Sequence, residues 1–388
     1  MSQYSGSLLT GLASPLETLI SEESDKQPAG IVGQIHERQV PLQAIDALDR
    51  LYGSLYASYR FQRLGDPTAT PHAWIGYQQG DIVGVLLFRL DGARVRVITE
   101  MVTLGAEVAT AFCRDVFDRY PCIHEIDFNA ISQLSPGLRF VCQSFAFSEN
   151  YVLELPTSVL EYEQALGKST RKTLRGYGNR LLRDHPGFEW HCYLPGSLPR
   201  HAQRALVVQL HEFKRRSMAA RGKLAQIDVR ETAQLLQMAA DCGLYGVGTI
   251  DGKLCAGSLA LRVGDHCTML LCAADPAFSQ YRLGLMACYW SLCDCLRLGV
   301  RQCHLLWGRY RYKEQLLAVA SSLHRVRVYR SRWQMLCRPI SVVGMASRGL
   351  LHRWRAWLLE DIPERRHPCA RCLLWLARRL SQGSDSNS

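Results

Sequence analysis

The sequence lacks the features of a membrane-spanning or secreted protein. No apolar run reaches the roughly 18 residues that a transmembrane helix needs. The first residues, MSQYSGSLLTGLASP, have neither the charged start nor the sustained apolar core of a signal peptide. These absences predict a cytoplasmic protein, whose contact with a membrane, where it has one, is peripheral and at the inner face.

The sequence also lacks a disulfide framework. Its 15 cysteines are not evenly spaced and lie in apolar runs, as small core residues do. The one metal-like spacing, Cys369-Ala-Arg-Cys372, has no second cysteine pair, so we predict no metal. A G-x-S-x-G turn is absent as well, which argues against a Ser-His-Asp hydrolase.

Acidic residues are the minority among the charged side chains. Lys and Arg number 46 against 35 Asp and Glu, which gives a formal charge of +11 and a pI near 9.0. That balance favours anionic partners such as phosphorylated cofactors, lipid headgroups or acidic sugars. Because no RNA- or DNA-binding signature accompanies the charge, we do not expect nucleic acid as a partner.

Turn glycines recur at a constant spacing. Gly80 and Gly92 separate three strand-like segments, which a helix and another strand follow. Gly252 and Gly264 stand in the same series, each at an offset of 172 residues. The repeated order predicts a structural duplication. Three antiparallel strands, a helix and a further strand describe a mixed sheet, so the fold class is α/β, with two similar lobes side by side.

The composition divides the chain into four regions. Residues 1–30 are rich in Ser, Glu and Asp and are predicted to be a mobile leader. The two lobes occupy residues 31–160 and 161–330, and a basic helical tail, in which arginines alternate with apolar residues, occupies 331–388. The tail suits an amphipathic element on an anionic membrane surface or beside a membrane synthase, and packing back on the second lobe is an equal alternative.

The most informative segment is 267–313. An apolar strand leads through the turn DPAFSQYRLG into a helix that begins at Gly284, and the segment ends with Gly308 and Tyr312-Lys313. The first N–H groups of a helix have no intrahelical acceptor, and the helix dipole favours an anion there by about 0.5–1 kcal/mol. Since glycine lets a ligand approach the backbone closely, the segment predicts a cofactor with a diphosphate group.

Four motifs in order resemble a known family. They are LPTSVLEYEQALGKSTRKTLRGYGNRL, YGVGTIDGKLCAGSLAL, DPAFSQYRLGLM and GRYRYK. Over roughly residues 150–320 this order resembles the GNAT acyltransferase superfamily. More closely it resembles the CelD-type acetyltransferases of cellulose and polysaccharide biosynthesis, which are relatives of the Fem peptidyltransferases. The resemblance implies two tandem GNAT-like lobes, an acyl-CoA donor (acetyl-CoA first) and a small-molecule or glycan-type acceptor of the cell envelope.

The resemblance also implies which residues bind the donor. The positions that match the pyrophosphate-binding turn and the strand before it are Ala273, Leu283, Gly284, Leu285 and Met286. Met286 stands where the family pattern has a second small residue, and Tyr281 stands at its Gln/Arg position.

Candidate catalytic residues are chosen by the chemistry of acyl transfer. Lys313, beside the predicted cleft, could hold an acyl carbonyl or a phosphate as a fixed positive charge, and Tyr312 precedes it. Attack by an amine or hydroxyl needs a base. The candidate groups are His211, Glu212, Asp275 and His304; of these we take Asp275 as the catalytic candidate, although the sequence does not decide among them. Gly308, Arg171 and Arg175 are the predicted substrate-binding residues. The two arginines lie on a predicted basic helix, residues 168–183, and two glycines give this segment a low helix propensity.

Two other functions fit the same sequence. A Fem-like transferase would take its acyl group from aminoacyl-tRNA, although no long paired-helix arm interrupts the second lobe. A catalytically inactive GNAT-like scaffold for a membrane-bound polysaccharide synthase would explain Met286 and the basic tail.

Overall fold

The structure, a computed structural model, describes residues 30–65, 69–220 and 229–356, and the described residues from Ile31 onward form one unit. The elements of the first part are β1 (Val32–His36), α1 (Leu42–Tyr52), α2 (Tyr59–Gly65), β2 (His72–Gln78), β3 (Asp81–Asp91), β4 (Arg94–Val97), β5 (Thr103–Leu104), α3 (Ala106–Arg119), β6 (Glu125–Ile131), β7 (Gln133–Leu134) and β8 (Val141–Glu154). Residues 1–29, which hold almost all of the predicted leader, lie outside the described residues.

The second part begins with α4 (Val159–Ala165), α5 (Lys168–Asp184), β9 (Phe188–Tyr193), α6 (Arg200–Ala219), α7 (Val229–Cys242), β10 (Gly243–Ile250), β11 (Lys253–Val263) and β12 (His266–Ala274). It continues with the 3-10 helix η1 (Pro276–Tyr281), α8 (Leu283–Arg297), β13 (Gln302–His304), α9 (Arg311–Gln315), β14 (Val319–Tyr329), α10 (Arg332–Leu336) and α11 (Pro339–Ala356).

One mixed sheet joins both parts. Within the described residues it contains 12 strands in the order β1-β2-β3-β4-β6-β14-β8-β13-β12-β11-β10-β9, and β5 and β7 pair apart from it. Strands β2, β3 and β4 are antiparallel, and α3 then leads to β6, which lies parallel to β4. Strands β10, β11 and β12, helix α8 and β13 repeat this arrangement. The predicted fold class and the duplication are confirmed.

The turn glycines explain why the structural repeat could be predicted from the sequence. Gly80, Gly92, Gly252 and Gly264 all have positive φ, between 59° and 93°. Residues with a side chain adopt that conformation at a cost, whereas glycine does not. Each glycine therefore fixes a hairpin between two strands, and the hairpin fixes their register.

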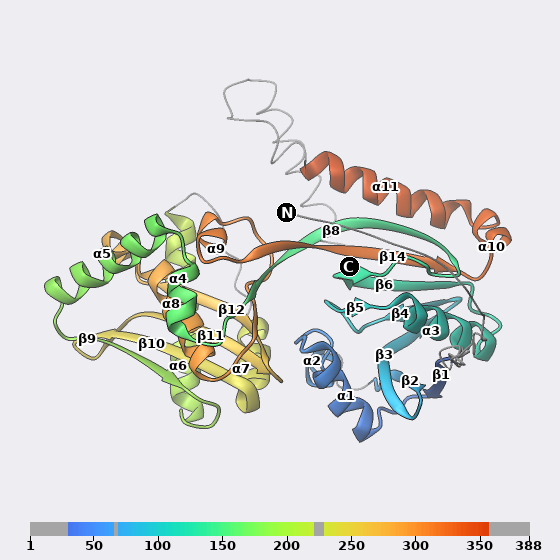
Figure 1. Ribbon diagram of the computed structural model, residues 1–388, viewed down its shortest axis with the longest axis horizontal. Helices are drawn as coiled ribbons and strands as arrows, with labels where there is room; N and C mark the ends of the chain where they lie inside the picture. The colour runs from blue at the N-terminus through green and yellow to red at the C-terminus, as the bar shows by residue number, and fades with distance from the viewer. Residues whose placement is uncertain (1–29, 66–68, 221–228, 357–388) are drawn as a thin grey trace, which may run out of the picture. The chain divides into compact units, whose positions relative to one another are not determined.

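Strands β8 and β14 tie the two copies together (Figure 1). Strand β14 pairs with β6 of the first copy and with β8, and the end of β8 pairs with β13 of the second copy. The sequence did not predict this exchange, which crosses the proposed boundary between residues 31–160 and 161–330. Those boundaries remain predictions about the two duplicated copies and do not separate two sheets.

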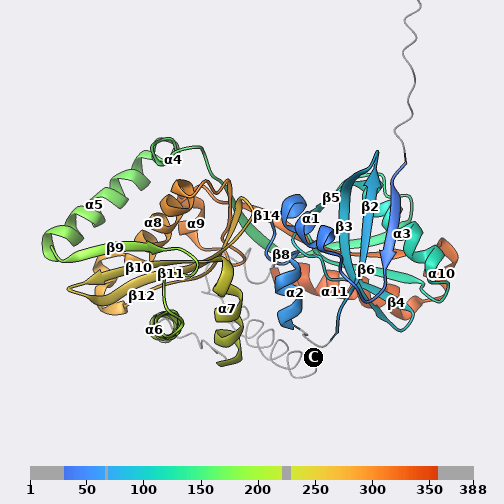
Figure 2. The same cartoon turned by 90° about the horizontal axis from the view of Figure 1, so that it is seen from below.

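Helices cover both faces of the second copy (Figure 2). Alternate strand residues Leu259, Leu261, Leu271 and Ala273 pack with α6 and α7 on one face. Side chains from the other face pack with α8 in a separate core cluster. This two-sided burial makes β11 and β12 nearly continuous apolar runs, as fully covered strands are.

The described part of the basic tail is helical, as predicted. Helix α10 contacts β14, and α11 packs along β8 rather than on the second copy's helices. The predicted tail beyond residue 356, with Cys369 and Cys372, lies outside the described residues. Within the part of the chain that the structure describes, no helix has the length and apolar character to cross a membrane.

Candidate functional site

In the second copy the two parallel strands separate beyond their paired residues, whereas in the first copy the main chain stays hydrogen-bonded at the corresponding place. His266–Thr268 of β12 pair with Gln302–His304 of β13, and β12 then continues to Ala274 paired with β11 but not with β13. Two residues past β13, Leu306 has a left-handed backbone conformation with φ 57°, as Ala130 of the first copy has with φ 47°, and Leu305 and Leu306 stay hydrogen-bonded to Tyr151 of β8. A cavity of about 740 Å³ lies along this divergence, lined by residues 269–274 on one side and 305–308 on the other.

The cavity ends at the start of helix α8. Arg282, in a left-handed conformation with φ 47°, forms the N-cap, and its carbonyl accepts from the N–H groups of Leu285 (2.9 Å) and Met286 (3.1 Å). The N–H groups of Leu283 and Gly284 have no hydrogen-bond acceptor among the described residues. A Cβ placed on Gly284 would meet no atom within 4 Å, so the space beside these two amides is open.

Four of the five predicted donor-binding residues line this cavity, namely Ala273, Leu283, Gly284 and Leu285. Met286 does not. Its side chain is only 2 % exposed and packs in the core beneath α8, and its Cε lies 3.6 Å from the position of a Cβ on Gly178. Residues two positions apart on a helix point about 200° apart, so Met286 faces inward when Gly284 faces the cavity.

Lys313 lines the cavity but is only 2 % exposed. It lies on the short helix α9. Its Nζ donates to the carbonyl oxygens of Leu306 (3.0 Å) and Trp307 (2.7 Å) and lies 4.8 Å from the centre of the Tyr151 ring. Burial lowers the pKa of the Lys313 ammonium to about 8. The lysine therefore fixes the loop that forms one wall.

Tyr312 and Gly308 complete that wall. Burial raises the pKa of the Tyr312 phenol, and its ring stacks on Tyr310 at 6.0 Å between centroids. Gly308 has φ 94°, and a Cβ there would lie 2.8 Å from Cε2 of Tyr310. Packing thus accounts for these residues without a chemical role for the phenol.

Asp275 lines the cavity and is held by two structural interactions. Its Oδ1 accepts from the N–H of Ala277 at 3.0 Å, which caps η1, and lies 3.4 Å from Nη1 of Arg216. The predicted catalytic carboxylate is thus brought to the cavity, where it also stabilises the turn that leads into α8.

The other acid/base candidates differ in position. His211 of α6 lines the cavity, with its Nδ1 3.0 Å from Oγ1 of Thr232. His304 lies deeper, 2.9 Å from Nδ2 of Asn150, and burial lowers the pKa of its imidazole to about 4. Glu212 pairs with Arg215 at 2.7 Å and does not line the cavity. His211 is therefore the imidazole that a bound substrate would meet.

The structure does not bring Arg171 and Arg175 to the cavity. Both lie on α5, whose buried residues Leu174 and Leu181 pack toward α8 and η1. Arg282, the N-cap of α8, lines the cavity instead, and its guanidinium lies 5.5 Å from the ring centre of Tyr177. Sequence reasoning had passed over Arg282 as part of the turn.

The first copy supplies one wall of the cavity. Leu55, Tyr56 and Phe61, from the segment between α1 and α2, line it, and burial raises the pKa of the Tyr56 phenol to about 12. No local signal in the sequence marks these three, because only tertiary packing brings them to the second copy.

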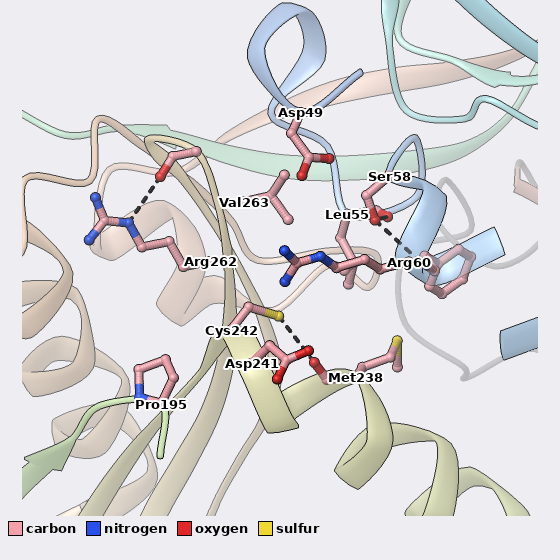
Figure 3. A pocket seen from close by; sticks show the side chains of 12 residues that line it. Asp49, Leu55, Ser58, Arg60, Pro195, Met238, Asp241, Cys242, Arg262 and Val263 are labelled. Carbon is pink, nitrogen blue, oxygen red and sulfur yellow. Dashed lines mark hydrogen bonds between the residues drawn. The ribbon is translucent and has the colours of Figure 1, made fainter. Parts of the chain in front are cut away.

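A smaller cavity of about 240 Å³ adjoins the first and shares Leu55, Phe61 and Met238 with it. Its charged residues are Asp49, Arg60, Asp241 and Arg262 (Figure 3). Burial raises the pKa of the Asp49 carboxyl, and its buried Oδ1 has no hydrogen-bond partner among the described residues. The Nε of Arg262 donates to the carbonyl of Gly264 at 2.9 Å.

The corresponding place in the first copy is filled by main chain. Beyond β4, the N–H of Met101 donates to the carbonyl of Ala130 at 2.7 Å, and β5 pairs in parallel with β7. Helix α3 also has an acidic residue, Glu107, in its first turn, whereas α8 has none. Since a carboxylate at a helix start competes with an anionic ligand, the second copy is the one suited to a diphosphate.

Residues 168–314 match the family model described as Acetyltransferase (GNAT) domain. These residues form a GNAT acetyltransferase domain. The domain contains strands β12 and β13, the region where these strands separate, and helix α8, and it ends within α9. The protein is accordingly an acyltransferase, and the match supports an acyl-CoA donor in general. The narrower CelD-type resemblance remains a prediction.

Solved structures share the fold at low sequence identity. One is FemX, at 9 % identity over 76 % of this chain and 96 % of that one, with a TM-score of 0.53. Another is a conserved protein of unknown function from Bacteroides thetaiotaomicron VPI-5482, at 10 % identity over 76 % and 100 % of the two chains and a TM-score of 0.48. The likeness to FemX shows the fold alone. No curated protein sequence matches this chain.

Proposed function

We propose that the GNAT acetyltransferase domain transfers an acyl group, acetyl in the first instance, from CoA to an amino or hydroxyl group. The single observation that carries the proposal is the cavity between β12 and β13, because it ends at the unpaired N–H groups of Leu283 and Gly284. Two amides and a helix dipole suit the pyrophosphate of CoA, and Arg282 adds a positive charge beside them.

The donor thioester would lie between Ala273 and the loop of residues 305–308, where the two strands diverge. Direct attack by the acceptor forms the new C–N or C–O bond and breaks the C–S bond. The leaving CoA thiolate then takes up a proton. We assign His211 the removal of the acceptor's proton, since it is the imidazole among the described residues that lines the cavity.

Direct transfer is favoured over a covalent enzyme intermediate. Cys272 is the thiol that lines the cavity in the described part of the chain, and its Sγ lies 3.5 Å from the carbonyl oxygen of Gly284, directed at the helix backbone. A ternary complex of donor and acceptor therefore needs no residue to carry the acyl group.

The acceptor belongs to the cell envelope in this proposal, as a polysaccharide-type or other small molecule. The net charge of +11 and the resemblance to CelD-type enzymes support an anionic or glycan acceptor. The smaller cavity, with Arg60 and Arg262 on its border and Asp49 unpaired, offers groups for both an anionic and a hydrogen-bond-donating part of such a molecule.

The test is isothermal titration of the full chain with acetyl-CoA, longer acyl-CoA and CoA, followed by product analysis with candidate sugar and amine acceptors. We expect heat with each CoA compound, and His211→Gln should lower kcat while leaving that heat unchanged. If no CoA compound binds, and aminoacyl-tRNA serves as donor instead, the proposal is wrong and the Fem-like alternative holds.

A further inference from the structure

Helix α11 exposes a row of large apolar side chains. Ile340 is 89 % exposed, Val343 62 %, Leu350 60 % and Leu351 70 %. Their spacing of three, seven and one places them on one side of an α-helix. We call these four residues the outer stripe. Trp333 and Leu336 of α10, just before the helix, are 71 % and 72 % exposed as well.

The opposite side of α11 is firmly packed, so the exposure of the outer stripe is not caused by a loose helix. Met345 is 2 % exposed, and a Cβ on Gly349 would lie 3.1 Å from Cβ of Phe145 in β8. Nη1 of Arg327 donates to Oγ of Ser341 at 2.6 Å. Figure 1 shows the helix lying along β8 and β14. One side holds the helix to the sheet, and the other presents apolar surface.

The charges around the outer stripe have one sign. Residues 331–356 contain the five arginines 332, 338, 348, 353 and 355, and neither Asp nor Glu. A protein partner usually offers mixed charges and defined pockets, whereas a bilayer rich in anionic lipid is a uniform negative surface over an apolar interior. An apolar stripe with only positive charges along its length complements that second kind of surface.

We infer that α10 and α11 dock on the surface of an anionic lipid bilayer, with the outer stripe among the acyl chains near the headgroups and the arginines at the phosphates. The lipid surface lies against the helix face that is remote from β8. This inference does not depend on the donor assignment, because vesicle binding needs neither CoA nor turnover.

The experiment is co-sedimentation of the full chain with vesicles of phosphatidylcholine alone and of phosphatidylcholine with phosphatidylglycerol. We expect binding only to the second kind, weakened by added KCl. Ile340→Glu with Val343→Glu should abolish it, and Arg348→Gln should weaken it by roughly fivefold, as expected for one arginine near such a surface. The matched control is Leu160→Glu with Leu182→Glu, because both residues are exposed leucines on other helices.

Four results would overturn the inference. The stripe variant could bind as the wild type does, or the wild type could bind neutral and anionic vesicles equally. In the third case the wild type binds no vesicles and is a dimer by light scattering, while the stripe variant is a monomer; the stripe is then an interface between two copies. A stripe variant that fails to bind and also melts at a lower temperature than the control variant would instead show that another part of the chain covers the stripe.

Discussion

A single methyl group added at Gly284 should raise the stability of the fold and weaken the binding of the donor. In Gly284→Ala the added Cβ meets no protein atom within 4 Å, so the folded structure accepts it without strain. Alanine in a helix is more favourable than glycine by about 0.5–1 kcal/mol. That gain corresponds to a rise in Tm of roughly 0.5–1.5 °C for a chain of this size.

The same methyl group occupies the space through which a pyrophosphate approaches the amides of Leu283 and Gly284. Hydrogen bonds to a charged group contribute about 1.5–3 kcal/mol each. Loss of one such bond weakens binding by about 10- to 150-fold. We therefore expect Gly284→Ala to be more stable than the wild type and to bind acetyl-CoA at least about tenfold more weakly.

The control is Gly176→Ala on α5, where a Cβ also meets nothing within 4 Å and which does not line the cavity. It should raise Tm by a similar amount and leave acetyl-CoA binding unchanged. Scanning calorimetry and isothermal titration measure both quantities. If Gly284→Ala binds acetyl-CoA as tightly as the wild type does, the donor does not rest on these amides and the reasoning fails.

Three further predictions concern side chains around the cavity. The folded-state pKa of His304 is about 4, below its ordinary 6.5, so the unfolded chain binds the extra proton first and stability falls as pH drops from 6.5 to 4. At about 1.4 kcal/mol per pH unit this amounts to roughly 3 kcal/mol, and urea unfolding of His304→Gln should lack that part of the slope. Lys313→Met removes the donor to the carbonyl oxygen of Trp307, and that of Leu306 keeps only the N–H of Tyr151. It should destabilise the fold by about 1–3 kcal/mol in urea, whereas Lys214→Met at the exposed rim should not. Cys272→Ala should keep its turnover within a few-fold, and mass spectrometry of the wild type with acetyl-CoA should find no acyl group on Cys272; an acylated thiol and an inactive variant would instead establish a covalent intermediate.

The parts of the fold that the sequence predicted correctly are those that local patterns determine. The hairpins depend on turn glycines that need a positive φ, and the predicted helix at Gly284 is α8, Leu283–Arg297. The pairing of β14 with β6 joins residues about 200 positions apart, and nothing in the strand's own sequence names its partner. Local pattern therefore determined the two copies, and tertiary packing decided how they are joined.

The same distinction applies to the candidate site. Gly284 and its neighbours were found because a helix start is a local feature. The family pattern suggested Met286 by spacing, but the helical rotation turns that residue into the core. Arg171 and Arg175 were chosen by charge alone, and charge does not say which side of α5 faces the cavity.

The duplication suggests why the cavity lies mainly in one copy while the other copy contributes only a wall of it. Both copies have the same strand order, so the difference lies in the chain beyond the parallel pair of strands. In the first copy β5 and β7 continue that pairing, and the hydrogen bond from Met101 to Ala130 fills the gap with main chain. In the second copy the carbonyl oxygen of Leu306 accepts from the N–H of Tyr151 in β8, and Lys313 donates both to this oxygen and to the carbonyl oxygen of Trp307. The wall of the cavity therefore depends on Lys313, because without that ammonium the carbonyl oxygen of Trp307 would lose its hydrogen-bond donor, and the loop would shift to regain one.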